Sequence, residues 1–138
     1  MISSEWRIVA VNNTGVAFGA SDSITVNGAI TTAVAGGTLT VPSTFAALLT
    51  GGASLANGAT LPGNAQNTTP GTNVVVSGDL HASATLSTTG PSGTVDFYVQ
   101  FYDTVAAAWP TAGASGIWIG SLAFTVAGTQ EADFSLGL

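Results

Sequence analysis

The chain has 138 residues and a net charge of −6, and its charged side chains are seven acids and a single arginine, Arg7. One cation cannot neutralise a row of phosphates or an anionic membrane surface, so nucleic acid and anionic membranes are excluded as direct partners. The chain has no cysteine, which excludes disulfides and thiolate chemistry. No apolar run approaches the roughly 20 residues of a membrane span, and the opening residues, MISSEWRIVAV, show no signal peptide.

The composition favours a folded domain with an almost neutral surface. Ala, Gly, Ser and Thr make up more than half of the chain, and 46% of the residues are hydrophobic but 6% are charged, whereas globular domains carry about 25% charge. Disordered chains are polar and highly charged, so disorder is a poor explanation. Burying small neutral side chains costs little entropy and desolvates no charge. We therefore expect one domain over residues 1–138 that works as part of an assembly.

The first half of the chain predicts strands and one short helix. Residues 6–11 are hydrophobic at odd and even positions, which indicates a strand buried on both faces. Residues 23–34 predict a hairpin, because Asn27-Gly28 is the strongest short signal for a type I′ turn. In residues 43–52, STFAALLTGG, a hydroxyl residue suited to capping and two terminal glycines predict a helix of at most two turns.

Residues 50–73, TGGASLANGATLPGNAQNTTPGTN, predict a long loop. Gly, Ala, Asn and Thr dominate this stretch, and Pro62 and Pro70 interrupt any regular structure. A loop of this length is uncommon inside a compact domain and is usually functional or mobile. Two interpretations stay open, an extended arm that makes lateral contacts and a flexible surface loop.

The second half of the chain predicts short strands separated by Gly and Pro turns. Strand patterns occur at residues 73–78, 80–86, 94–103, 116–127 and 131–138. Residues 103–110, DTVAAAWP, are a second, weak helix candidate that ends at Pro110. We expect an all-β fold, an antiparallel β-sandwich of about eight to nine short strands with jelly-roll or immunoglobulin-like topology.

The alternation also predicts how residues 80–89 and 94–103 pair with each other. A four-residue loop between Thr89 and Thr94 would place Leu86 opposite Phe97, Ala84 opposite Val99 and Ala82 opposite Phe101 on the core face. A slip by one residue would set Ala and Leu against the tyrosines, so the hydrophobic pattern favours this register.

The same register gathers polar and aromatic side chains on the opposite face. This candidate interaction face consists of His81, Ser83, Thr85, Asp96, Tyr98, Gln100 and Tyr102, and residues 117–126 are a possible extension with Ile119, Ser121, Ala123 and Thr125. Tyrosines are favoured in protein interfaces, which is the interpretation that we prefer. Aromatic rings beside an acid and an amide also suit a sugar, and Trp109 or Trp118 could join the two tyrosines in such a site. In a third interpretation, the chain's own loop covers the face.

No catalytic motif is recognisable. His81 is the only histidine, and Ser83 lies about 7 Å away along the same strand. Neither Asp79 nor Asp96 is placed to orient the His81 ring as a triad requires, and no G-x-S-x-G motif is present. We therefore predict no enzyme activity and no catalytic residue, and we expect a surface histidine that packs on Tyr102.

Metal and cofactor sites are not expected either. Glu131 and Asp133 are the only close pair of acids, and they lack the spacing of a calcium loop. A solvated strand edge is the better interpretation of this pair. No glycine-rich stretch has the lysine and the strand-to-helix context of a phosphate loop.

The whole-chain pattern has three parts. A lysine-free β-domain rich in small residues starts within MISSEWRIVAV, carries the loop GGASLANGATLPGNAQNTTPG and stops within a strand at DFSLGL. In this pattern the chain resembles the small virion proteins of tailed bacteriophages, in particular head decoration or cement proteins and related capsid or tail accessory subunits. The resemblance implies a non-enzymatic structural protein that binds major capsid or tail subunits in many copies.

The resemblance also implies a place in the virion after assembly in the host cytoplasm, and a homo-oligomer or another multi-copy assembly. It assigns no functional residues. The alternative function is a carbohydrate-binding or adhesin module that uses the face around Tyr98 and Tyr102.

Overall fold

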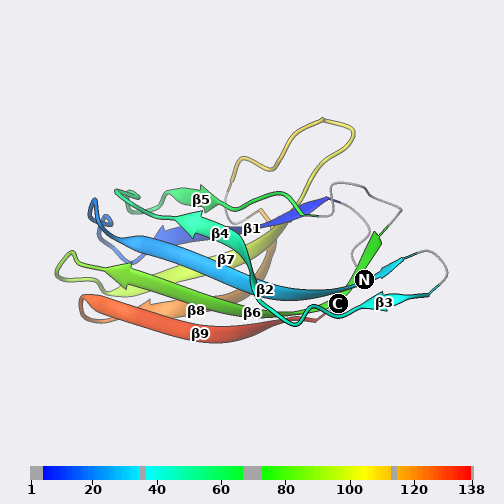
Figure 1. The fold of residues 1–138 in the computed structure, drawn as a ribbon. Helices are drawn as coiled ribbons and strands as arrows, with labels where there is room; N and C mark the ends of the chain where they lie inside the picture. The colour runs from blue at the N-terminus through cyan, green and yellow to red at the C-terminus, as the bar shows by residue number, and fades with distance from the viewer. Residues whose placement is uncertain (1–4, 35–36, 67–72, 113–114, 138) are drawn as a thin grey trace.

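The structure is a computed structural model that describes residues 5–34, 37–66, 73–112 and 115–137. Within these ranges the chain forms nine strands and no helix, and all of the strand pairs are antiparallel. The strands belong to two sheets that pack face to face (Figure 1). The fold is therefore an all-β sandwich, as the sequence predicts.

Each sheet draws its strands from both halves of the chain. The four-stranded sheet has the order β5 (Thr60–Pro62), β1 (Trp6–Asn13), β7 (Gly93–Phe101) and β8 (Ile117–Phe124). The five-stranded sheet has the order β3 (Leu39–Thr40), β2 (Ser23–Val34), β6 (Asn73–Leu86) and β9 (Gly128–Gly137), and β4 (Ala46–Gly51) also pairs with β2.

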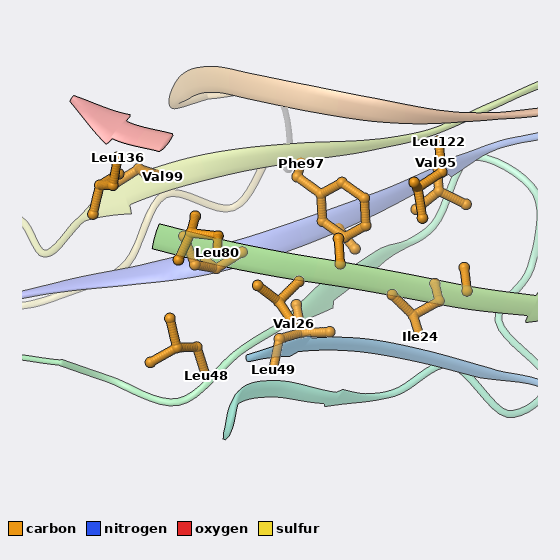
Figure 2. Close-up of a cluster of buried hydrophobic side chains, with 14 of the residues drawn as sticks. Ile24, Val26, Leu48, Leu49, Leu80, Val95, Phe97, Val99, Leu122 and Leu136 are labelled. Atoms are coloured by element: carbon orange, nitrogen blue, oxygen red, sulfur yellow. The ribbon is translucent and has the colours of Figure 1, made fainter. Parts of the chain in front are cut away.

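The inner faces of the two sheets share one hydrophobic core. Phe97 on β7, Leu80 on β6 and Ile24 on β2 are each at most 1% exposed, and Figure 2 shows them together between the ribbons. The Phe97 ring lies 5.8 Å from the ring of Phe134 on β9, centroid to centroid. Burying one large apolar side chain contributes about 1.5–3 kcal/mol, so this core is the main source of stability.

Backbone contacts close one side of the sandwich. The N–H of Gly63 donates to the carbonyl of Ile8 on β1 (2.8 Å), and the N–H of Asn64 donates to the carbonyl of Leu48 on β4 (2.9 Å). A Cβ atom at Gly63 would lie 2.5 Å from the Leu48 oxygen and 2.6 Å from the Ile8 oxygen. Only glycine permits this approach, which joins the sheets on one side and leaves β8 and β9 as the edge strands on the other.

The predicted strand at residues 6–11 is confirmed, and the long loop that was expected at 50–73 is partly wrong. β1 is central in its sheet, and Ile8, Val9 and Ala10 are fully buried. Residues 50–51 belong to β4, and β5 pairs with β1. Backbone bonds tie residues 58–66 to β1, so the described part of this stretch is no extended arm, and residues 67–72 lie outside the described residues.

The predicted hairpin at Asn27-Gly28 is wrong. β2 runs unbroken through both residues and pairs with β6 along its whole length. Gly28 is needed for packing, because a Cβ atom there would lie 2.5 Å from Leu48 Cδ1 and 2.9 Å from Leu80 Cδ2. Two leucines from the neighbouring strands fill the space that a side chain at Gly28 would need.

The predicted helix at residues 43–52 is also wrong, because this segment contains strand β4. Its register against β2 shifts at one point: Leu49 faces Val26 and Ala47 faces Asn27, which leaves Leu48 as an extra residue. This β-bulge lets two consecutive leucines, Leu48 and Leu49, both point into the core. The bulge hides the alternation by which a strand is recognised.

The predicted pairing of residues 80–89 with 94–103 is wrong, although the core face was identified correctly. The expected strands 73–78 and 80–86 form one strand, β6, which pairs with β2 and β9. β7 lies in the other sheet and pairs with β1 and β8. Six of the predicted inward residues are buried: Ala82, Ala84, Leu86, Val95, Phe97 and Val99. The seventh, Phe101, is half-buried.

Candidate functional site

The structure divides the predicted interaction face between opposite sides of the sandwich. His81, Ser83 and Thr85 lie on the outer face of the five-stranded sheet, because they alternate with the buried residues of β6. Asp96, Tyr98 and Gln100 alternate with the buried residues of β7 and lie on the outer face of the four-stranded sheet. The predicted patch is therefore two separate patches.

His81 is held by an acid from β9. Its Nδ1 atom lies 2.7 Å from Oδ1 of Asp133, which faces it across the strand pair, and its Nε2 atom lies 3.9 Å from Oε1 of Glu131. The hydrogen bond that His81 Nδ1–H donates to Asp133 raises the pKa of His81; slight burial opposes this, and the charges of both acids add to it. The expected packing of His81 on Tyr102 is wrong, because Tyr102 follows β7 of the four-stranded sheet, whereas His81 lies on β6 of the five-stranded sheet.

The acids near His81 form an exposed strand edge. The side chain of Asp133 is 86% exposed and that of Glu131 is 60% exposed. This agrees with the interpretation of the pair as a solvated edge, where charge also discourages pairing with other strands. Among the described residues, no group of three or more His, Asp or Glu side chains is arranged to hold a metal ion.

Gln100 is sealed into the outer face of the four-stranded sheet. It is 1% exposed, and its Oε1 atom accepts hydrogen bonds from Nε (3.1 Å) and Nη2 (2.9 Å) of Arg7. Its Nε2 atom donates to the carbonyl of Ala112 (3.0 Å). The chain's own loop after β7 thus contacts Gln100, and this loop is not the one expected at 50–73.

An aromatic contact holds the same loop in place. The guanidinium carbon of Arg7 lies 4.4 Å from the centre of the Trp109 ring, and the rings of Tyr102 and Trp109 meet edge to face at 5.3 Å. Burial lowers the pKa of Arg7. The only arginine of the chain is therefore used internally, as a support for the loop.

The loop after β7 is a tight turn, so the weak helix prediction at 103–110 is wrong. Asp103 and Ala108 exchange backbone hydrogen bonds of 2.9 and 3.2 Å. Oδ1 of Asp103 accepts the N–H groups of Val105 (2.8 Å) and Ala106 (3.0 Å), as short acidic side chains do at turns. The loop projects from the sandwich (Figure 1, yellow).

Asp96 is the centre of a polar network on the open part of this face. Its Oδ1 atom accepts hydrogen bonds from the hydroxyls of Ser121 and Thr94, and its Oδ2 atom accepts one from Nδ2 of Asn13 (2.7 Å). Burial acts to raise the pKa of Asp96, but these three hydrogen bonds outweigh it and lower the pKa. Asp96 is thus a fixed, ionised acceptor at neutral pH.

Trp118 joins this network, contrary to the sequence pattern. In the sequence, Trp118 is in phase with Leu122 and Phe124, which are buried, yet Trp118 is 60% exposed. Its Nε1–H donates to Oγ of Ser121 (3.1 Å). Asn13 was also missed by the sequence reasoning, because nothing in a single strand pattern says which strand will be its neighbour.

The predicted extension of the face along β8 is partly correct. Ser121 lies opposite Asp96, and Ala123 lies opposite Thr94. Ile119 instead packs against the core.

Comparisons with family models, with curated proteins and with solved structures found no match to this chain. Within the described ranges, no helix is long and apolar enough to cross a membrane.

Proposed function

We propose that this protein is a non-enzymatic structural subunit that binds a multi-copy protein assembly. The observation that supports this most strongly is a set of exposed apolar side chains at the end of β2, on β3 and on the segment before β4. These side chains are 39–71% exposed and lie on the β2–β3 hairpin and on the segment that leads into β4: Val34, Leu39, Val41 and Phe45. We call them the wing residues. Figure 1 shows this hairpin extending at the end of the molecule.

Grouped apolar side chains at a surface favour contact with another protein. An isolated exposed hydrophobic residue needs no explanation, but several along one short segment are typical of interaction sites. Covering these side chains desolvates no charge, and none of the wing residues is charged. Contact through the wing residues therefore costs little desolvation free energy.

The negative charge of the protein favours some partner surfaces over others. Arg7 is occupied by Gln100 and Trp109, and the acids of the described surface have no lysine or second arginine beside them. A neutral or basic protein surface fits this chain, whereas an acidic one would be repelled.

The resemblance to tailed-bacteriophage virion proteins carries the proposal one step further. We propose a capsid decoration or cement subunit that binds major capsid or tail protein subunits of a virion. Each copy would bury apolar area against neighbouring subunits and would stabilise the assembled state by mass action.

Binding to stripped particles tests the proposal. Virions from the system that encodes this chain would be depleted of it, mixed with purified protein and sedimented. Replacing Leu39 and Val41 by Ser should lower the bound fraction at least about tenfold, because buried apolar area is lost. Val126→Ser is the matched control, since Val126 is also an exposed apolar residue but lies in the β8–β9 turn. Equal binding of both variants and the unchanged protein would contradict a role for the wing residues.

A further inference from the structure

A β-bulge in β8 turns Trp118 toward the solvent. Phe97 faces Gly120 and Tyr98 faces Trp118, so Ile119 is an extra residue in the pairing of β8 with β7. The bulge reverses the alternation on one side of Ile119, which sends Trp118 to the same outer face as Ser121. Bulges commonly re-aim a side chain at a functional site.

The bulge produces a row of side chains along the outer face of β7 and β8. Its three steps are the facing pairs Tyr98–Trp118, Asp96–Ser121 and Thr94–Ala123. Successive pairs are separated by two residues of strand, or roughly 7 Å. A depression of about 420 Å³ adjoins the last pair and is lined there by Thr94, Ala123 and Thr125. We call this arrangement the Trp118 row.

The Trp118 row combines an open aromatic ring with a fixed polar group. The hydrogen bond from its Nε1 atom to Ser121 orients the Trp118 ring, and the same Ser121 hydroxyl donates to Asp96. Three donors hold the Asp96 carboxylate, which offers about four acceptor positions. One acceptor position of Asp96 therefore remains for an outside donor within reach of the ring, and the side chain of Asn13 beside it is exposed.

We propose that the Trp118 row binds a neutral carbohydrate. One face of a pyranose ring presents C–H groups, which suit the electron-rich face of an indole, and its hydroxyls are donors for Asp96. The carboxylate of Asp96, with no cation among the row's residues, disfavours acidic sugars. The length of the row fits a short oligosaccharide better than a single ring. This inference goes beyond the structural role proposed above, and neither depends on the other.

The geometry also explains why the site differs from the tyrosine face expected from the sequence. Gln100 is covered by the loop after β7, and Tyr102 packs on Trp109. Neither of them belongs to the Trp118 row. Of the residues predicted for a sugar site, Asp96, Tyr98 and the possible addition Trp118 remain, and Trp118 supplies the aromatic platform.

A single site of this kind binds weakly, at about millimolar dissociation constants for one hexose. Many copies on one particle would raise the effective affinity by about a hundredfold or more through multivalency. The first experiment is therefore an array of neutral glycans, probed with the protein displayed in many copies on beads. Sialylated glycans on the same array serve as the acidic comparison.

Variants assign the binding to the row. Trp118→Ala should lower the array signal at least about tenfold, and Asp96→Asn should lower it several-fold, because each removes one of the two groups that contact the sugar. Val105→Ala, which truncates an exposed apolar side chain outside the Trp118 row, should leave the signal unchanged. Circular dichroism of each variant checks that the sandwich is intact.

Ligand-detected NMR with glucose, galactose, mannose and N-acetylglucosamine supplies a second readout. The proposal predicts saturation transfer to at least one of these sugars, and loss of the transfer in Trp118→Ala. The proposal is overturned if no neutral glycan binds in either experiment, if binding survives Trp118→Ala, or if acidic glycans bind better than neutral ones.

Discussion

Asp133 lies directly opposite His81 in the pairing of β9 with β6, and its carboxylate holds the imidazole at 2.7 Å. Because the pair raises the pKa of the only histidine, the charged form of His81 is favoured in the folded protein. We predict that Asp133→Asn lowers the pKa of His81 toward its ordinary value of about 6.5. An NMR titration of the single histidine measures this, and Asp79→Asn, on the same face but without a contact to His81, should change the pKa less. Equal effects of the two variants would contradict the pairing.

The same pair gives stability a pH dependence of definite sign. A pKa raised by folding means that the stabilisation is fully present below about pH 6.5 and is lost as the pH rises through the folded-state value. The free energy of unfolding should therefore fall as the pH rises from about 6.5 through the folded-state pKa of His81. This fall should be smaller in Asp133→Asn. The effect is small because the pair is solvent-exposed. Urea unfolding at a series of pH values measures it, and a rise in place of the fall would contradict the sign.

Phe97 should be one of the most costly residues to truncate. Its ring is fully buried between the two sheets, and Phe97→Ala should reduce the unfolding free energy by about 3–5 kcal/mol. Phe45→Ala removes an exposed ring of the same type and should change the stability by less than about 0.5 kcal/mol. Urea unfolding of both variants is the measurement, and a small loss for Phe97→Ala would place the core elsewhere.

Gly28 separates a continuous strand from a hairpin. Gly28→Ala forces a Cβ atom against Leu48 and Leu80 and should cost about 1–3 kcal/mol. Asn27→Ala should change the free energy of unfolding by less than about 0.5 kcal/mol, because Asn27 lies on the outer face of β2 and does not have a positive φ. Comparable losses for the two variants would instead support an Asn-Gly turn at this position.

Trp109 should control the loop after β7. Trp109→Ala removes the ring that contacts Arg7 and Tyr102, so amide hydrogens of residues 103–112 should exchange faster while those of β1 and β7 stay protected. Val105→Ala is the control, because Val105 lies at the turn and is 97% exposed. Unchanged exchange in Trp109→Ala would show that the aromatic contact does not hold the loop.

The sequence predicts the fold class well because a period of two is a local signal. Alternation places Val95, Phe97, Leu80 and Leu86 in the core without any knowledge of their neighbours. It fails wherever a bulge shifts the phase, as at Leu48 in β4 and at Ile119 in β8. Because of the first bulge, the sequence of β4 matches a helix pattern. Because of the second, the exposed Trp118 is in phase with buried residues of β8.

Strand pairing is the level at which the prediction fails, because pairing is not local. Strands 80–86 and 94–103 are neighbours in sequence with matching patterns, but they lie in different sheets, and the outward side chains of β6 and β7 point in opposite directions. No spacing in the chain shows that His81 meets Asp133 or that Asp96 meets Asn13 and Ser121. The candidate site could therefore be predicted residue by residue only in part, namely at Asp96 and Tyr98, with Trp118, Ser121 and Ala123 as possible additions.

The structural role is tested most directly by the copy number of this protein in purified particles. Quantitative mass spectrometry of virions from the encoding system should find it at a constant ratio to the major capsid or tail protein, unchanged by repeated purification. Absence from the particles, or a trace amount that washing removes, would contradict the proposal that the protein is a structural subunit.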